Sequence, residues 1–374
     1  MAVPEYFHLP SEYSIVVCED CGFCYAATKA TLEDYDYYYS HCNSYSGTPN
    51  ESAAKTKFNQ QAVELITNLA DKNALLLDMG YGKGNFMRLL KKSGFKNIYG
   101  IDPSIDSITQ MQNEGFTVYQ GSIFDKIRSD LKEKFDFVFL FDVLEHLLYP
   151  DKAIENISGY LKENGCILVG VPNYAALFDD NSILVNQFNQ EHINYFSPIS
   201  LDNLLKHKNF YRDNSENIAE LEITDSLGIL MIARYNGKKT QNSQTEPEEE
   251  ISYLRDEICR KSIESYLHRN DKLAQTCNEK LYDFTKDSAP SIYIWGTGAY
   301  VMWLLSNTSL GKMKIEAFVD NNPTKIGKEL IGRPIICAEN VKNDYPIIIC
   351  CMRHSQEIVT QIKNANMINN YMIL

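Results

Sequence analysis

The sequence lacks the long apolar run that a membrane-spanning helix requires. No stretch of its 374 residues approaches the roughly 18 consecutive apolar residues that mark such a helix. The first ten residues have neither a basic start nor the apolar core of a secretory signal. We therefore expect a cytoplasmic protein with no membrane span.

Cationic side chains are in the minority. The chain has 36 Lys and Arg against 49 Asp and Glu, which gives a formal net charge of −13. Proteins that bind phosphate backbones gather Lys and Arg on one surface. The acidic balance therefore argues against nucleic acid as a partner and leaves small molecules as the expected ligands.

A regular disulfide framework is also absent. The ten cysteines are scattered, apart from Cys18, Cys21 and Cys24 in "CEDCGFC". One C-x-x-C pair could form a zinc site with Cys24 and either His41 or Cys42, but this is not the usual spacing of two pairs. We expect ordinary reduced cysteines, with zinc as the alternative.

Four regions follow from the pattern of the chain. Residues 1–50 are rich in aromatic residues and show no sustained period, which predicts a small loop-rich module that contains the cysteines. Strand-like and helix-like segments alternate over residues 51–235, and this order is typical of an α/β domain. Residues 236–289 combine a polar linker with a long amphipathic helix, and residues 290–374 predict a second, smaller α/β domain.

The apolar segments of the second region predict a mostly parallel sheet. Near-continuous apolar strands indicate a sheet that helices cover on both faces. We expect strands over residues 74–79, 97–102, 116–120, 135–141, 165–171, 217–223 and 227–235.

A glycine-rich turn follows the first of these strands, in "LLLDMGYGKGNF". Gly80, Gly82 and Gly84 indicate unusual dihedral angles or a ligand against bare backbone. A P-loop would place Lys and then Ser or Thr after its last glycine, whereas Asn85 and Phe86 stand here. The dinucleotide fingerprint G-x-G-x-x-G is not matched either.

Two acids at strand ends indicate the ligand of this turn. Asp78 lies two residues before the first glycine, where a carboxylate can pair with an ammonium group. Asp102 ends the next strand, where an acid can accept hydrogen bonds from ribose hydroxyls. A nucleoside joined to an amino acid would satisfy both.

Residues of about 52–235 thus resemble a class I S-adenosylmethionine-dependent methyltransferase, a Rossmann-like fold with a mostly parallel seven-stranded sheet. The resemblance rests on "LLLDMGYGKG", "YQGSIFD", "FDFVFLFDVLEHL" and "GCILVGVPN" in that order. It implies that S-adenosylmethionine is the cofactor, that Ser122 and Ile123 line the adenine pocket, and that Phe141 and Asp142 border the methionine end. Glu145 and His146 in the third segment are expected to shape the cofactor pocket, with catalysis by His146 as the alternative.

An insertion after the fifth strand, "QFNQEHINYFSPISLDNLL", carries the candidate catalytic residues. His192 beside Glu191 offers a near-neutral base next to a carboxylate. The alternative is a structural role, in which the insertion anchors a helix over residues 201–208 that Ser197 or Ser200 caps.

The whole layout resembles the three-domain sugar C-methyltransferases, which act on nucleotide-linked ketodeoxysugars and carry a Glu-His pair in this insertion. Asn189 and Gln190 depart from the Tyr and His of that family, so we expect methylation of a carbohydrate-derived acceptor at carbon or oxygen. By the same resemblance the C-terminal, Rossmann-like domain contacts the nucleotide of the substrate. The alternative is a nucleotide-binding or cofactor-binding protein without methyl transfer, with NAD-linked redox chemistry in residues 290–374, where Gly296, Gly298 and Asp320 form a dinucleotide-like pattern.

Overall fold

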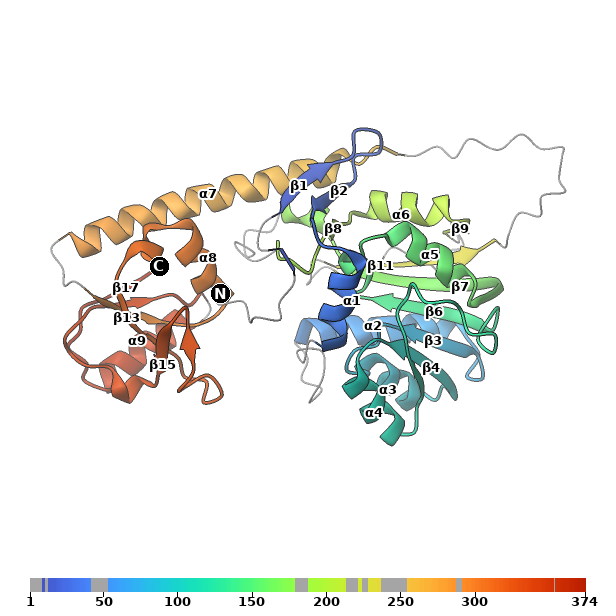
Figure 1. Ribbon diagram of the computed structural model, residues 1–374, viewed down its shortest axis with the longest axis horizontal. Helices are drawn as coiled ribbons and strands as arrows, with labels where there is room; N and C mark the ends of the chain where they lie inside the picture. Colours follow the sequence, from blue (N-terminus) through green and yellow to red (C-terminus); the bar gives the residue numbers. More distant parts are fainter. Residues whose placement is uncertain are drawn as a thin grey trace. The chain divides into compact units, whose positions relative to one another are not determined.

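The computed structural model describes most of the chain (Figure 1). The described residues are 9–10, 13–41, 53–178, 188–212, 221–223, 228–236, 254–286, 291–352 and 354–374. They divide into two compact units. The larger unit holds the described residues from 9 to 178 and from 189 to 263, and the smaller unit holds those from 264 to 374 with Phe188.

The larger unit is built on a mostly parallel sheet. Its strands are β3 (Leu75–Met79), β4 (Asn97–Asp102), β5 (Thr117–Gln120), β6 (Phe135–Phe141), β7 (Leu161–Pro172), β10 (Leu221–Ile223) and β11 (Gly228–Tyr235). They lie in the order β10-β11-β7-β6-β3-β4-β5, and the short β9 (Phe210–Tyr211) pairs with β11. Strands β3 to β7 pair in parallel, whereas β9, β10 and β11 pair antiparallel. The expected seven-stranded sheet is confirmed, except that residues 217–220 lie outside the described part.

Helices cover both faces of this sheet. The helices of the larger unit are α1 (Leu32–His41), α2 (Ala53–Leu69), α3 (Asn85–Lys92), α4 (Ile105–Asn113), α5 (Pro150–Ser158) and α6 (Pro198–His207). Helices α2, α3 and α4 pack on the face that carries Leu76 and Phe139, and α5 and α6 pack on the face that carries Leu77 and Leu140. Neighbouring residues of a strand point to opposite faces of the sheet. When both faces are buried, both neighbours must therefore be apolar.

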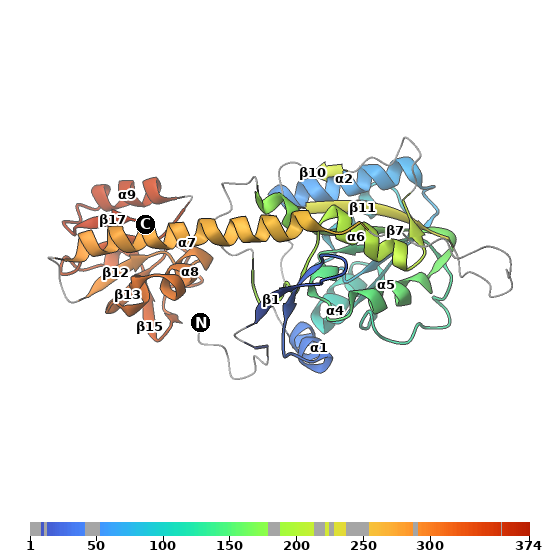
Figure 2. The ribbon, with the colours of Figure 1, turned by 90° about the horizontal axis from the view of Figure 1, so that it is seen from above.

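Residues 13–41 are more regular than the sequence predicts. Strands β1 (Ser14–Val17) and β2 (Cys24–Ala27) form an antiparallel pair, and β8 (Asn194–Tyr195) of the insertion adds to β2. Helix α1 follows and lies in the same unit as the large sheet (Figure 2). The prediction of a loop-rich segment was wrong here, because Thr31 and Asp34 exchange hydrogen bonds that cap α1.

Helix α6 has the capped start that the structural alternative for the insertion predicts. Ser197 is its N-cap and forms a capping box with Ser200. Ser197 also donates a hydrogen bond to buried Asp256, just before helix α7 (Glu257–Thr285). The helical character predicted after residue 251 is confirmed from Glu257 onward, whereas the predicted linker lies almost entirely outside the described residues.

The smaller unit contains a second sheet. Its strands β12 (Ile292–Trp295), β13 (Ile315–Val319), β14 (Glu329–Leu330), β15 (Arg333–Ile336), β16 (Ile347–Ile349) and β17 (Tyr371–Ile373) lie in the order β14-β15-β13-β12-β16-β17. All the pairs are parallel except β14 with β15. Helices α8 (Ala299–Asn307) and α9 (Ser355–Asn364) belong to this unit.

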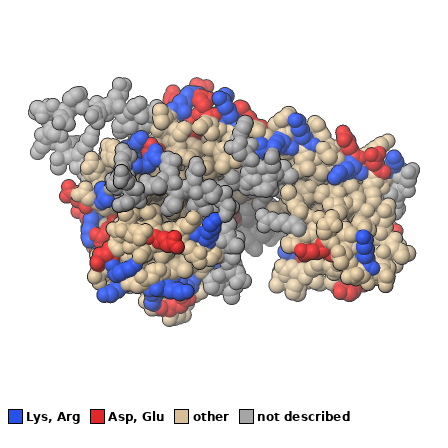
Figure 3. Space-filling view, turned by 180° about the vertical axis from the view of Figure 1, so that it is seen from behind, with Lys and Arg blue, Asp and Glu red and all other residues tan. Residues whose placement is uncertain are grey.

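The described surface mixes charges of both signs. On the face in Figure 3, Lys and Arg alternate with Asp and Glu instead of gathering in one region. Among the described helices, none has the length and apolar character that crossing a bilayer requires.

Candidate active site

A pocket opens where β3, β4 and β6 end. Its walls include Gly80 and Gly82 of the turn after β3, Asp102 at the end of β4, Ser122 and Ile123 after β5, and Asp142 after β6. These six are among the residues that the sequence proposes for cofactor binding. Parallel strands bring their carboxyl ends to one edge, which is where ligands of open α/β sheets bind.

The glycine turn leaves room for a ligand. Gly80 and Gly82 have φ values of 77° and 51°, in the left-handed region that favours glycine. A Cβ atom at Gly82 would meet no atom within 4 Å, whereas one at Gly80 would lie 2.7 Å from Val143. The backbone of Gly82 is therefore exposed to the pocket on a side that no other described side chain fills.

Asp102 is held in place by the backbone of the same wall. Its carboxylate accepts hydrogen bonds from the amides of Gly82 at 2.8 Å and Ser104 at 2.9 Å. Each oxygen thus keeps a second lone pair for a ligand. Burial raises the pKa of Asp102 to about 6, against the two amide hydrogen bonds, which lower it.

Three of the proposed cofactor residues do not line the pocket. Asp78 is buried with 3% of its surface exposed, and burial raises its pKa to about 7, while nearby Lys55 lowers it. Gly84 is the N-cap of α3, and a Cβ there would meet Met111. Phe141 packs edge-on against Phe58 and Phe86.

Asp142 has an unusual backbone conformation at the pocket wall. Its φ is 57°, in the left-handed region that non-glycine residues rarely adopt. Its carboxylate forms an ion pair of 2.5 Å with Lys55 of α2. Such conformations persist where the surroundings hold them and are often found at functional sites.

Helix α1 closes one side of the pocket, which the sequence analysis did not anticipate. Tyr35, Asp36 and Tyr39 line the pocket. Burial raises the pKa of Asp36, and the carboxylate of Asp125 raises it further, although a hydrogen bond with Ser122 lowers it. The signal was present in the spacing of Tyr35, Tyr38 and Tyr39, at i, i+3 and i+4 of a helix.

The tyrosines of α1 also hold the insertion that carries Glu191 and His192. Tyr35 donates a hydrogen bond to the carbonyl of Gln190 at 3.3 Å, and Tyr38 donates one to the carboxylate of Glu191. The sequence proposes Glu191 and His192 as a candidate base pair. In the structure, the hydroxyl of Tyr174 lies 3.1 Å from Nδ1 of His192.

His192 lies beside His146. The two ring centroids are 4.8 Å apart and nearly perpendicular. His146 lines the pocket, with the hydroxyl of Tyr39 at 2.9 Å and the carbonyl oxygen of Glu191 at 3.0 Å from its Nδ1. Burial lowers the pKa of His146 to about 4, with a further decrease from His192, and burial also lowers the pKa of His192. Both rings are therefore neutral at pH 7.

Among the described residues, the cysteines of the N-terminal segment do not form a group of three or more metal-ligating side chains. Cys18 and Cys21 interact with each other, and this interaction lowers the pKa of Cys18. The thiol of Cys24 is buried and interacts with Cys259 instead. Cys42 and the side chain of His41 lie outside the described part, so a zinc site there stays an untested alternative.

Comparison with known proteins assigns the region around this pocket. Residues 54–213 match the family model described as "Methyltransferase domain". The matched range includes the glycine turn, Asp102, His146 and the insertion. Residues 289–374 match a different model, "C2185-like, N-terminal".

Individual relatives of the methyltransferase domain are distant. A mitochondrial ubiquinone biosynthesis O-methyltransferase of Candida albicans is 25% identical over 189 residues, which are 46% of this chain and 55% of the relative. The chain thus spans about half the length of that curated relative.

Solved structures resemble the domain more weakly. A 1,6-didemethyltoxoflavin-N1-methyltransferase of Burkholderia thailandensis has a TM-score of 0.41 at 15% identity, covering 61% of this chain and 100% of its own. A magnesium protoporphyrin IX methyltransferase of Synechocystis PCC 6803 has a TM-score of 0.41 at 13% identity, covering 54% and 97%. These scores are too low to support an argument about the site.

The residues present fit S-adenosylmethionine. A buried carboxylate with spare lone pairs, Asp102, lines the same pocket as the glycine turn and His146. Asp102 would hold the ribose hydroxyls, and Gly80 and Gly82 would admit the ligand against bare backbone. Asp142 would lie near the amino-acid end, and Asp78, buried one residue before the pocket-lining Met79, would act there through its charge.

The raised pKa values of Asp78 and Asp102 predict a pH dependence of cofactor binding. Both carboxylates take up a proton as the pH falls through about 7 and about 6, well above their ordinary 3.8. A protonated carboxyl group binds hydroxyl and ammonium donors less well, so the affinity for S-adenosylmethionine should fall between pH 7 and pH 5. Calorimetry over this range would measure the change in affinity. The α-amino group of the ligand, with a pKa of about 8, stays protonated throughout, so the change would report the two carboxylates.

In the protein without cofactor, the same two carboxylates change stability in the opposite direction, so that stability is higher at low pH. Because the folded state retains protons that the unfolded state releases, these two groups lower the free energy of unfolding as the pH rises from about 4 to about 7. The cofactor should therefore raise the melting temperature more at pH 7 than at pH 5. An affinity that stays constant or increases toward pH 5 would contradict this assignment.

Proposed function

We propose that the protein transfers the methyl group of S-adenosylmethionine to a small molecule, at an oxygen or an acidic carbon. The observation that supports this most is one pocket with a cofactor-type wall, Gly80, Gly82 and Asp102, and a histidine, His146, that also lines it. The name of the curated relative, an O-methyltransferase, favours an oxygen acceptor.

The residues of the site have different roles in the reaction. S-adenosylmethionine, when bound, supplies a methyl group that its sulfonium already activates. Asp102 and the glycine turn position the cofactor, since alignment accounts for much of the rate of such a displacement. The cluster of Glu145, His146 and His192 is where the acceptor loses its proton. Tyr174 and Tyr39 orient the two imidazole rings of this cluster.

A carbohydrate-derived acceptor, linked to a nucleotide, is the specific substrate that we propose. Glu191 and His192 in the insertion support it, together with the second α/β unit after residue 290. We propose that this unit is Rossmann-like and contacts the nucleotide. Its glycine turn requires glycine at Gly296, where φ is 124° and a Cβ would lie 2.7 Å from the carbonyl oxygen of Cys350.

Redox chemistry with NAD in that unit has less support. Asp320, which would hold the ribose, already accepts hydrogen bonds from Thr297, from Lys325 at 3.2 Å and from the amide of Asn322 at 2.8 Å. Its carboxylate therefore has less capacity left than that of Asp102.

Release of S-adenosylhomocysteine tests the proposed function. The full chain would be incubated with S-adenosylmethionine and a panel of nucleotide sugars, free sugars and phenolic acceptors. We expect acceptor-dependent release with at least one class. Cofactor binding without release for any class would favour a binding protein.

A further inference from the structure

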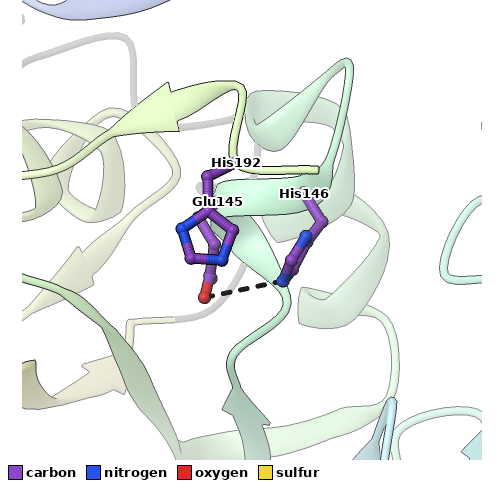
Figure 4. Close-up of side chains that lie close together, drawn as sticks. All are labelled: Glu145, His146 and His192. Atoms are coloured by element: carbon purple, nitrogen blue, oxygen red, sulfur yellow. Dashed lines mark ion pairs between the residues drawn. The ribbon is translucent and has the colours of Figure 1, made fainter. Parts of the chain in front are cut away.

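Three metal-ligating side chains converge at the end of the cofactor pocket. Glu145 and His146 lie on the short 3₁₀ turn η2 (Leu144–His146) after β6, and His192 lies on the insertion before β8. Their ligand atoms all lie within 4.8 Å of one another. Figure 4 shows Glu145 paired with the ring of His146, and the ring of His192 lies beside that of His146.

Glu145 is buried without a hydrogen bond among the described residues. Only 1% of its surface is exposed, and neither carboxylate oxygen has a hydrogen bond among the described residues. The nearest ring nitrogen, Nε2 of His146, is 3.7 Å away. A buried carboxylate that is not hydrogen-bonded is costly, and native proteins retain such groups chiefly where they bind something.

The described hydrogen bonds of both rings are made at Nδ1, so Nε2 is the nitrogen of each ring that can face a cation. The carbonyl oxygen of Glu191 only accepts, so Nδ1 of His146 carries the hydrogen and Nε2 has the lone pair. Nε2 of His146 lies 3.7 Å from a carboxylate oxygen of Glu145, which is too long for a hydrogen bond between them. Nδ1 of His192 is engaged by Tyr174. Rings that bind a metal through one nitrogen are generally fixed through the other in this way.

We propose that Glu145, His146 and His192 bind one divalent transition-metal cation, with zinc as the best fit. Two imidazoles and one carboxylate form the ligand set of catalytic zinc sites, which keep a fourth position open. Magnesium prefers oxygen ligands and suits this set poorly. Ligand atoms of tetrahedral zinc lie about 3.4 Å apart, as bonds of about 2.1 Å require, so the three side chains close by roughly 1 Å on binding.

The open position faces the pocket through His146, which gives the cation a role in the reaction. This role rests on the proposed function. An acceptor hydroxyl bound there loses its proton to solvent, because a bound cation lowers the pKa of such a group. The oxygen then bonds to the methyl carbon, the carbon–sulfur bond breaks, and neutral S-adenosylhomocysteine leaves.

Metal titration of the full chain tests the site without turnover. The protein, first treated with chelator, would be titrated with Zn²⁺, Co²⁺ and Mg²⁺ by calorimetry, and Co²⁺ followed by visible absorption. All measurements would use the Cys18→Ser/Cys21→Ser background, so that thiolates do not contribute. We expect about one equivalent of Zn²⁺ or Co²⁺, and no comparable binding of Mg²⁺.

Matched variants assign the ligands. Glu145→Gln and His192→Asn should each weaken Co²⁺ binding by roughly 100-fold or more, since loss of a ligand exceeds the effect of its supporting partners. His354→Asn is the control, because His354 is exposed and pairs with Glu357 of α9, outside the cluster. Stoichiometric binding that survives both cluster variants, or no binding by the parent protein, would overturn the proposal.

Two further measurements distinguish loss of metal binding from unfolding and from failure of the proposed function. Glu145→Gln should be at least as stable as the parent protein without metal, because it replaces an unsatisfied buried carboxylate, so lost binding would not reflect unfolding. Metal binding without methyl transfer to any acceptor would leave the site standing and contradict the proposed function. Full turnover after removal of the metal would contradict the role of the cation alone.

Discussion

Replacement of His192 by alanine is expected to lower turnover by about 10²- to 10⁴-fold, the range for loss of a group that acts in proton removal. The affinity for S-adenosylmethionine should stay nearly unchanged, because His192 is not among the residues that line the cofactor pocket. Its ring instead lies between Tyr174 and His146. Steady-state kinetics with the identified acceptor, together with calorimetry of cofactor binding, would measure both quantities.

Two variants place this result in context. Glu191→Gln should cost less than His192→Ala, because the carboxylate of Glu191 accepts a hydrogen bond from Tyr38, whereas Nδ1 of His192 lies against the hydroxyl of Tyr174. His354→Ala should leave turnover at the level of the parent protein. If His192→Ala binds the cofactor normally and turns over at the parental rate, His192 is a packing residue and the proton leaves elsewhere, with His146 next to be examined.

Replacement of Asp102 by alanine is expected to weaken S-adenosylmethionine binding by roughly 1.5–3 kcal/mol, the range for hydrogen bonds to a charged group. This corresponds to a loss of about 10- to 150-fold in affinity. The carboxylate is 95% buried at the pocket wall, and the amides of Gly82 and Ser104 fix its direction. Calorimetry of the free protein with the cofactor would measure the change.

The control for this prediction lies four residues away. Asp106 is exposed in the first turn of α4, so Asp106→Ala should retain the parental affinity. Asp102→Asn keeps the shape but removes the charge, and its affinity should also lose the dependence on pH contributed by this group. A folded Asp102→Ala protein with unchanged affinity would exclude Asp102 from the ribose site.

The sheet could be predicted from the sequence because its signals are local. Strand β6 alternates between two buried faces, with Phe139 on one and Leu140 on the other, so both must be apolar and the run is visible in the sequence. The glycines at positions 80 and 82 follow directly from the positive φ angles of the turn. Asp102 is found by the same reasoning, because a strand end fixes where its side chain lies.

The tyrosine-rich helix could not be recognised from composition alone. Helix α1 is polar as well as aromatic, and Tyr35 and Tyr38 donate hydrogen bonds to Gln190 and Glu191 of the insertion. Tyr39 reaches His146 across 107 positions of the chain. Contacts at such separations leave no local period in the sequence. The spacing of the tyrosines indicates a helix, but not that this helix lines the pocket.

By itself, the sequence determined the parallel sheet, the glycine turn and the acid at the end of β4, since each depends on residues within a few positions of one another. Only the tertiary structure decided which groups meet at the far end of the pocket. Glu145 and His146 come from the turn after β6 and His192 from an insertion 45 or more residues later. The backbone pairing of β8 with β2, and the amide of Ile193 donating to the carbonyl of Glu145 at 2.8 Å, bring them together. The burial that leaves Glu145 without a hydrogen bond exists only once those two segments have packed.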